Sequence, residues 1–190
     1  MNLSNKLTIS RIILTFVFMY FLFARWTGAK FLAFLTFSAA CATDYLDGYL
    51  ARTRNQITDF GKFMDPVADK ILILAAFLAF VELRLIPAWT VVIIITREAA
   101  VTGLRIFALG RGRVIEAEEA GKHKTVSQMI AIFIVLIFLM LRDAAKYLSF
   151  WNDGTERWVL NLIFISILIA VILTLISGVS FLWRNRKIFA

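Results

Sequence analysis

Six apolar stretches, each close to the length of a membrane-crossing helix, constrain this chain more than any other feature. An α-helix needs about 20 residues to cross the hydrocarbon core of a bilayer. The hydrophobic share of 61% and the charged share of 18% are also too apolar for an ordinary soluble domain. We therefore expect an all-α integral membrane protein with six transmembrane helices. Their expected ranges are 7–24, 31–50, 66–83, 86–108, 124–141 and 159–183.

The basic residues are distributed unevenly between these stretches. When the connections are assigned alternately to two sides, most Lys and Arg residues fall on the side that holds both termini and the segment from Asp44 to Asp69. Cytoplasmic loops carry such an excess, so we expect both termini in the cytoplasm. The net charge of +8 is then explained by topology and by attraction to anionic lipid headgroups, and a nucleic-acid partner is not expected.

Nothing in the sequence divides the chain into several domains. No low-complexity tract, long linker or internal repeat separates the apolar stretches. We expect residues 1–190 to form a single membrane domain. Cys41 is the only cysteine, which excludes an intramolecular disulfide and a cysteine-cluster metal site.

Four aspartates lie in or beside the second and third apolar stretches, where ionised carboxylates need partners. Asp44 and Asp47 are spaced i, i+3 and share one face of a helix, and Asp65 and Asp69 are spaced i, i+4 on the next. A short loop makes these helices antiparallel neighbours, so the four carboxylates can converge. Pro66 fits the first turn of the third helix, where its missing N–H costs nothing. Hard divalent cations prefer such oxygen ligands, and pairs of them serve phosphoryl transfer.

Small and basic residues share the helix face of the first two aspartates. Gly48 and Ala51 allow a bulky ligand to approach the backbone closely. Arg52 offers a planar pair of donors to phosphate oxygens. The ordinary alternative is a set of solvated ion pairs between the acids and basic neighbours such as Arg54 and Lys62. The pattern has eight fixed positions, of which Gly61 is one. A chance match at all eight is very improbable, so the pattern predicts a ligand site.

The complete pattern, D-x2-D-G-x2-A-R-x8-G-x3-D-x3-D, resembles the signature of the CDP-alcohol phosphatidyltransferases. The resemblance implies a six-helix membrane enzyme, commonly a homodimer, with a site open to the cytoplasm. It implies CDP-diacylglycerol as donor and two divalent cations, Mg²⁺ or Mn²⁺, bound by Asp44, Asp47, Asp65 and Asp69. It also implies that Asp69 is the general base.

The same resemblance implies the residues that contact the donor nucleotide. They are Gly48, Arg52, Thr58, Asn5 and Thr8. Asn5 and Thr8 belong, with Arg11, to an N-terminal Asn-x2-Thr-x2-Arg element that would face the nucleotide. An interfacial helix start with a snorkelling arginine is an equally good interpretation of this element.

A second cluster bears on the acceptor alcohol. Arg97 lies within the fourth apolar stretch, where an unpaired cation is costly. Either it pairs with an aspartate of the metal site, or it forms a cationic pocket with Arg105 and Lys124 for an acceptor that carries phosphate. The elements Arg-Glu-x3-Thr-Gly-Leu-Arg and Gly-Lys-x-Lys-Thr resemble those of bacterial phosphatidylglycerophosphate synthases, which implies sn-glycerol 3-phosphate. Serine, inositol or inositol phosphate is the alternative acceptor.

A small membrane transporter is the competing class, because transporters also place acids inside membrane helices. A transporter would have charges near the bilayer midplane and some inverted repeat. Here the aspartates lie near one end of their helices and no repeat is visible. We therefore expect a transferase that makes phosphatidylglycerophosphate and CMP, located in a bacterial inner membrane with its site facing the cytoplasm.

Overall fold

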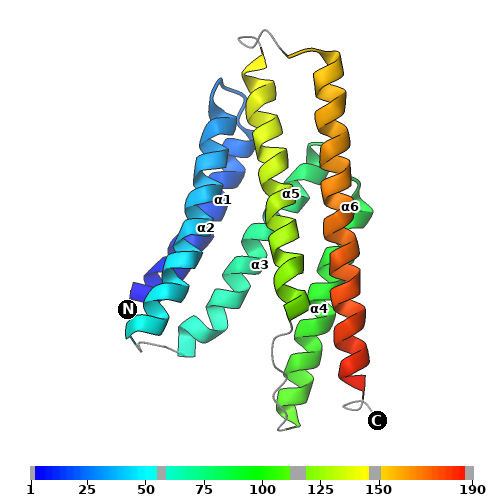
Figure 1. The fold of residues 1–190 in the computed structure, drawn as a ribbon. Coiled ribbons are helices and arrows are strands. Elements are labelled where there is room, and N and C mark those ends of the chain that lie inside the picture. Colours follow the sequence, from blue (N-terminus) through cyan, green and yellow to red (C-terminus); the bar gives the residue numbers. More distant parts are fainter. Residues whose placement is uncertain (1–2, 55–58, 112–118, 146–150, 187–190) are drawn as a thin grey trace. The chain divides into compact units, whose positions relative to one another are not determined.

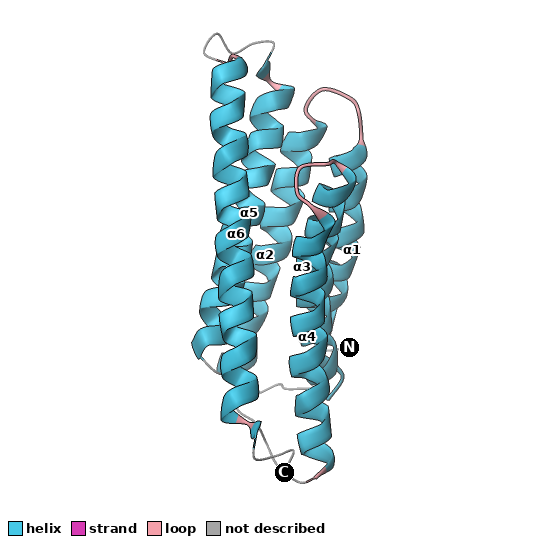
Figure 2. Ribbon diagram, turned by 90° about the vertical axis from the view of Figure 1, so that its right-hand side faces the viewer, coloured by secondary structure: helices cyan, strands magenta, loops and turns pink. Residues whose placement is uncertain are grey.

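The computed structural model contains helices and no strand over the residues that it describes, 3–54, 59–111, 119–145 and 151–186 (Figures 1 and 2). For residues 3–7, 44–54, 59–63, 65–66 and 119–120 the backbone alone is described. Within these described ranges six helices follow one another. They are α1 (Leu3–Phe23), α2 (Ala29–Arg54), α3 (Asp59–Glu82), α4 (Ala88–Gly110), α5 (Glu119–Asp143) and α6 (Asp153–Arg184). The prediction of an all-α chain is confirmed.

The helices match the six apolar stretches in order, but several extend beyond them. The third helix starts at Asp59 rather than at residue 66, and the sixth starts at Asp153 rather than at residue 159. An apolar stretch ends where the side chains become polar, whereas helical hydrogen bonding continues through polar residues. Pro66 is consequently inside α3 and not in its first turn, so that expectation was wrong.

Two helical segments of the described chain are long and apolar enough to cross a membrane. They are Gly121–Asp143 of α5 and the whole of α6. Shorter apolar segments run over Thr8–Phe23 and Ala29–Thr43. The 32 residues of α6 span about 48 Å at about 1.5 Å per residue, which exceeds the hydrocarbon thickness of about 30 Å.

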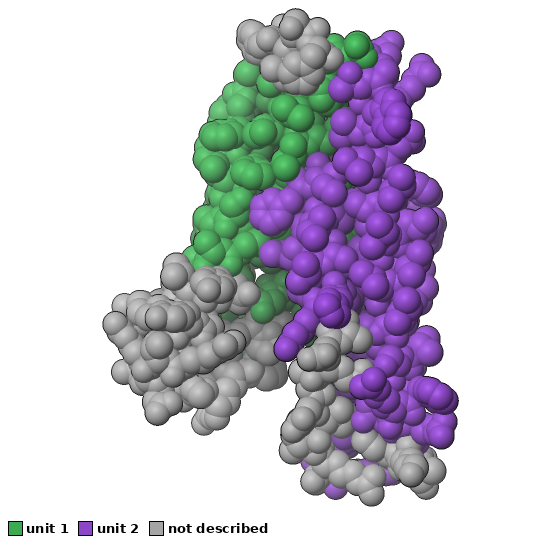
Figure 3. Space-filling model, in the orientation of Figure 1, with its two compact units in different colours: residues 1–80, 135–152 green, residues 81–134, 153–190 purple. Residues whose placement is uncertain are grey.

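The chain divides into two compact units (Figure 3). Unit 1 comprises residues 1–80 and 135–152, and therefore contains α1, α2, most of α3 and the last part of α5. Unit 2 comprises residues 81–134 and 153–190, and therefore contains α4, the first part of α5 and α6. The aspartate motif belongs to unit 1, and the second basic cluster belongs to unit 2.

In unit 1, α1 and α2 form a closely packed helical hairpin. Ala29, Ala33 and Ala40 of α2 are fully buried, and such small side chains let two helices approach closely. Phe18 of α1 packs on Phe37 of α2 with ring centroids 5.3 Å apart. This packing fixes α1 against the helix that carries the first two aspartates.

Polar contacts close the turn between these two helices. Gly28 has a φ of +90°, which residues with a side chain rarely adopt, and its N–H donates to Oδ2 of Asp143 at 3.0 Å. Lys30 Nζ donates to the carbonyl oxygens of Leu22 and Ala24 at 2.6 and 3.0 Å. The last carbonyls of a helix lack intrahelical donors, so Lys30 satisfies two groups at the end of α1.

In unit 2, α4 packs against α6. One face of α6 is buried, and the opposite face exposes large apolar side chains such as Ile165, Ile169 and Ile176. A helix that is apolar all round is typical of a membrane span. Thr174 and Ser177 are polar exceptions on its buried face, and both are at most 1% exposed.

Candidate functional site

The aspartate motif lies on two helices of unit 1. Asp44 and Asp47 fall in α2, and Asp65 and Asp69 fall in α3, so each pair shares one face of its helix. The end of α2 and the start of α3 lie at the same end of unit 1 as the start of α1 (Figure 1). Of the four aspartate side chains the structure describes only that of Asp69.

Most of the predicted donor contacts lie outside the described side chains. Gly48 and Arg52 belong to α2 and Asn5 belongs to α1, but only their backbone is described, and Thr58 lies outside the described residues altogether. Thr8 is described and is fully buried in α1. The assignment of these residues to the nucleotide stays a prediction.

Arg11 of α1 contacts the predicted general base. Its Nη1 donates to Oδ1 of Asp69 at 2.6 Å; the side chain of Arg11 is 0% exposed and that of Asp69 is 42% exposed. A buried cation needs an anionic partner, which explains why an arginine is tolerated in this apolar helix. The snorkelling interpretation of Arg11 is therefore wrong, because its head group is buried against Asp69.

The aspartate set fits divalent cations by its chemistry. Carboxylates are hard oxygen donors, and the 42% exposure of Asp69 leaves room for a ligand at this carboxylate. Among the side chains that the structure describes, no group of three His, Cys, Asp or Glu residues comes together. Because three of the four aspartate side chains are outside that set, metal ligation by Asp44, Asp47, Asp65 and Asp69 stays a prediction.

A network of charged and polar side chains lies in unit 2, and we call it the Glu98 network. It consists of Arg97 and Glu98 of α4, Lys124 of α5 and Ser177 of α6. Arg97 Nη1 donates to Glu98 Oε1 at 3.1 Å, and Lys124 Nζ donates to the same oxygen. Arg97 Nη2 donates to Ser177 Oγ at 2.6 Å. The network therefore joins all three helices of unit 2.

The members of the Glu98 network are well buried. The exposed side-chain fractions are 11% for Arg97, 15% for Glu98 and 7% for Lys124. Charges removed from water interact strongly, so the two cations of this network would bind an anion that contacts them more strongly than exposed cations would. The sequence predicted Arg97 and Lys124 at this place. It did not predict the roles of Glu98 and Ser177.

Arg105 lies eight residues beyond Arg97 on α4. Its Cζ is 5.7 Å from the ring centroid of Phe181, which is a cation–π contact with α6. Its Nε is buried and has no hydrogen-bond partner among the described residues. Within that part of the chain Arg105 also forms no ion pair, so its guanidinium retains donors for a ligand. The alternative prediction paired Arg97 with an aspartate of the metal site. The side chains of three of those aspartates lie outside the described ones, so this alternative stays a prediction.

A second polar contact ties α5 to α6 one turn away from Lys124. Gln128 Nε2 donates to Thr174 Oγ1 at 3.0 Å, and both side chains are buried. Thr174 Oγ1 in turn donates to the carbonyl oxygen of Ala170 at 2.6 Å. The hydroxyl of Thr174 within the last apolar stretch was the sequence signal that could have revealed this position.

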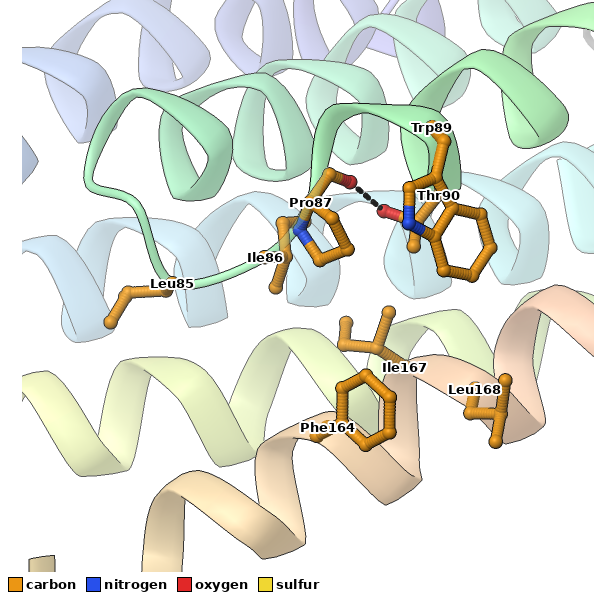
Figure 4. Close-up of a pocket in the computed structure, with 8 residues that line it drawn as sticks. All are labelled: Leu85, Ile86, Pro87, Trp89, Thr90, Phe164, Ile167 and Leu168. Carbon is orange, nitrogen blue, oxygen red and sulfur yellow. Dashed lines mark hydrogen bonds between the residues drawn. The ribbon is translucent and has the colours of Figure 1, made fainter. Parts of the chain in front are cut away.

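A small cavity in unit 2 is separate from these contacts. No charged side chain lines it. The lining residues are Leu85, Ile86, Pro87, Trp89, Thr90, Phe164, Ile167 and Leu168 (Figure 4). Thr90 Oγ1 donates to the carbonyl oxygen of Pro87 at 2.7 Å, which closes the first turn of α4. The volume of about 10 Å³ accommodates about one water molecule and is too small for a sugar phosphate.

The sequence model of a known family covers nearly the whole chain. The family described as CDP-alcohol phosphatidyltransferase matches residues 1–183. A protein of Bacillus subtilis (strain 168), named CDP-diacylglycerol–glycerol-3-phosphate 3-phosphatidyltransferase, is 37% identical over 97% of this chain and 95% of its own length. A Haemophilus influenzae protein with the same name is 35% identical over 80% of this chain and 89% of its own.

A third relative matches a shorter part of the chain at a higher identity. It is a Mycobacterium tuberculosis (strain H37Rv) protein named "Probable phosphatidylglycerophosphate synthase", 42% identical over 72% of this chain and 66% of its own length. The family match includes the helices that carry the aspartate motif and those that carry the Glu98 network. The chain therefore belongs to the CDP-alcohol phosphatidyltransferase family.

Proposed function

We propose that this chain transfers the phosphatidyl group of CDP-diacylglycerol to sn-glycerol 3-phosphate, which yields phosphatidylglycerophosphate and CMP. The observation that carries this proposal is the 37% identity, over 97% of the chain, to a relative named for that reaction. The buried cations of unit 2 support the acceptor, because arginine and lysine form strong charge-assisted hydrogen bonds to phosphate. The protein is accordingly an enzyme of phospholipid biosynthesis.

The protein is an integral membrane enzyme. Two long apolar helical segments and membership in a family of membrane enzymes support this statement. In our proposal all six helices cross the bilayer, with both termini and the active site at the cytoplasmic face of a bacterial inner membrane. The uneven distribution of Lys and Arg supports that orientation. Residues 1–190 act in the proposal as one functional domain that pairs into a homodimer.

Divalent metal ions are the general cofactor of this family. The proposed ligands of two such ions, Mg²⁺ or Mn²⁺, are Asp44, Asp47, Asp65 and Asp69. When bound, the ions supply positive charge that neutralises the pyrophosphate and stabilises CMP as the leaving group. The donor nucleotide is proposed to contact Gly48, Arg52, Thr58, Asn5 and Thr8.

Asp69 is the proposed general base. Its carboxylate takes the proton from the C1 hydroxyl of glycerol 3-phosphate. The hydroxyl oxygen then bonds to the phosphorus that carries diacylglycerol, and the bond between this phosphorus and the CMP oxygen breaks. The hydrogen bond from Arg11 at 2.6 Å restricts the rotation of the Asp69 carboxylate, so that the proton is taken in a fixed geometry.

Arg97, Arg105 and Lys124 are the proposed partners of the acceptor's phosphate. A phosphomonoester brings close to two negative charges at neutral pH, which suits a cluster of mostly buried cations. Serine or inositol brings no phosphate and would leave these donors unused. Inositol phosphate would use them, so it is the stronger alternative acceptor.

Release of CMP tests the proposal. Purified protein is incubated with CDP-diacylglycerol, Mg²⁺ or Mn²⁺, and each alcohol in turn: glycerol 3-phosphate, serine, inositol and inositol phosphate. We expect release with glycerol 3-phosphate. Release with another alcohol alone would assign a different acceptor within the family. Absence of release with every alcohol, although metal binds, would contradict the transferase and favour a non-enzymatic membrane protein such as a transporter.

A further inference from the structure

Two adjacent residues of α6 fit around one arginine of the Glu98 network. Ser177 Oγ accepts a hydrogen bond from Arg97 Nη2 at 2.6 Å. A Cβ atom built on Gly178 would lie 3.0 Å from Cγ of the same arginine, which is closer than an ordinary carbon–carbon contact. Ser177 therefore binds the end of the Arg97 side chain, and Gly178 makes room for its stem.

These residues belong to a stripe on the buried face of α6. The stripe consists of Thr174, Ser177, Gly178 and Phe181, spaced i, i+3, i+4 and i+7. Each member that has a side chain contacts a residue of the neighbouring helices in unit 2. Thr174 accepts from Gln128 of α5, Ser177 accepts from Arg97, and Phe181 lies under Arg105. The stripe thus contacts both arginines of the predicted acceptor site.

The stripe also brings the two arginine head groups towards each other. Arg97 and Arg105 are eight residues apart on α4, which is about 12 Å along the helix axis. Their contacts on α6, Ser177 and Phe181, are four residues apart, or about 6 Å. Because α4 and α6 run in the same direction in unit 2 (Figure 1), the side chains converge from their backbones towards the stripe.

The geometry points to Ser177 and Gly178 as positioning residues that hold Arg97 in place for the phosphate of the acceptor. This inference rests on the proposed function, and it adds a specificity determinant on a helix that neither the aspartate motif nor the basic cluster includes. With Nη1 on Glu98 and Nη2 on Ser177, the guanidinium is fixed in its plane. Its Nε is buried without a hydrogen-bond partner among the described residues, and a phosphate oxygen would satisfy it.

The substitution Ser177→Ala removes the hydroxyl and leaves the helix intact. We expect the KM for glycerol 3-phosphate to rise about tenfold, because a hydrogen bond to a charged group is lost, while the KM for CDP-diacylglycerol changes less than about twofold. Ser177→Thr retains a hydroxyl and should restore most of the affinity for the acceptor. Thermal unfolding of each variant in detergent shows whether it is folded.

The matched control is Ser166→Ala on the same helix. Ser166 Oγ donates to the carbonyl oxygen of Ile163 within α6, so its loss should leave both KM values unchanged. Gly178→Ala should raise the KM for glycerol 3-phosphate as Ser177→Ala does. Gly110→Ala at the end of α4 should not, because a Cβ at Gly110 meets no atom within 4 Å. If Gly178→Ala does not fold, the result with Ser177→Ala alone tests the inference.

The outcomes separate this inference from the proposed function. Wild-type protein that releases no CMP with glycerol 3-phosphate overturns the proposed function and the inference together. Wild-type protein that uses glycerol 3-phosphate, with a Ser177→Ala variant whose two KM values are unchanged or change equally, overturns the inference alone. A selective rise in the acceptor KM, reversed by Ser177→Thr and absent in Ser166→Ala, supports it.

Discussion

Arg11 on α1 and Asp69 on α3, 58 residues apart in sequence, are joined by a hydrogen bond of 2.6 Å between Nη1 and Oδ1. The pair is asymmetric, because Arg11 is 0% exposed whereas Asp69 is 42% exposed. Because Arg11 is shielded from water, protein groups such as Asp69 must compensate its positive charge. The carboxylate of Asp69 is still accessible to solvent or a ligand. Structural and chemical roles of this pair can therefore be separated by changing one partner at a time.

The first prediction concerns the chemistry of Asp69. Asp69→Asn should lower CMP release by about 10²–10⁴-fold, because the proposed general base is lost, while CDP-diacylglycerol binding is largely kept. Both are measurable with purified protein, the second by equilibrium binding of the nucleotide lipid. Asp143→Asn, which changes the carboxylate that accepts from Gly28, is the control and should retain turnover. Near-normal turnover of Asp69→Asn would show that the base is another group.

The second prediction concerns the stability of the same pair. Asp69→Ala should destabilise the protein more than Arg11→Met, by about 1–3 kcal/mol, because it leaves a buried cation with less compensation whereas methionine replaces the cation by an apolar side chain. Thermal unfolding followed by tryptophan fluorescence in detergent compares the two without any substrate. A melting temperature of Arg11→Met below that of Asp69→Ala would contradict this account of the pair.

The third prediction concerns Arg105. Arg105→Ala should raise the KM for glycerol 3-phosphate by about tenfold or more, and should raise that for CDP-diacylglycerol much less, because a charge-assisted phosphate contact is lost. Arg111→Ala is a matched control, since Arg111 is exposed and its Cζ lies 4.5 Å from the ring centroid of Phe107 on the same helix. Equal effects of Arg105→Ala on both KM values would argue against an acceptor pocket.

The fourth prediction concerns Glu98, whose carboxylate accepts from both Arg97 and Lys124. Glu98→Gln removes a negative charge between two mostly buried cations and should lower the free energy of unfolding by about 1–3 kcal/mol. Glycerol 3-phosphate should then raise the melting temperature of the variant more than that of the wild type, because its phosphate replaces the missing charge. Equal thermal shifts in the two proteins would count against phosphate binding at this network.

The fifth prediction concerns topology. In a Cys41→Ala background, which has no other cysteine, Asn152→Cys should react with an impermeant thiol reagent in intact cells. Asn185→Cys should react only after the membrane is opened, because six spans place the connection before α6 outside and the C-terminus inside. Labelling of both positions from the same side would exclude the six-span arrangement.

The helices could be predicted from the sequence because apolar stretches of bilayer length have few other structures available. Their ends could not, since α3 begins at Asp59 among polar residues that carry no hydropathy signal. Arg97 and Lys124 were recognisable as a basic cluster. Their shared contact, Glu98, is adjacent to Arg97 in sequence but gave no sign of reaching Lys124 on another helix.

The other contacts that the sequence did not reveal join residues that are far apart along the chain. Arg11 was compatible with either a nucleotide contact or a snorkelling side chain, and only the hydrogen bond between α1 and α3 identifies its partner, Asp69. Ser177 and Gly178 appear in the sequence as ordinary small residues of a membrane helix. Their contact with Arg97 spans 80 residues, and helical periodicity alone carries no information about which helices are neighbours.

The two hydrogen bonds that Lys30 donates in the α1–α2 turn have a consequence for the order in which the chain folds. Its bonds to Ala24 and Leu22 span six and eight residues, whereas the bond between Arg11 and Asp69 spans 58. Domains acquire structure from the N-terminus during synthesis. The Lys30 contacts of the α1–α2 turn involve only nearby residues and can therefore form before Asp69, the proposed general base, is in place. We therefore expect the α1–α2 hairpin to form first and to support α1 when the contact between Arg11 and Asp69 is made later.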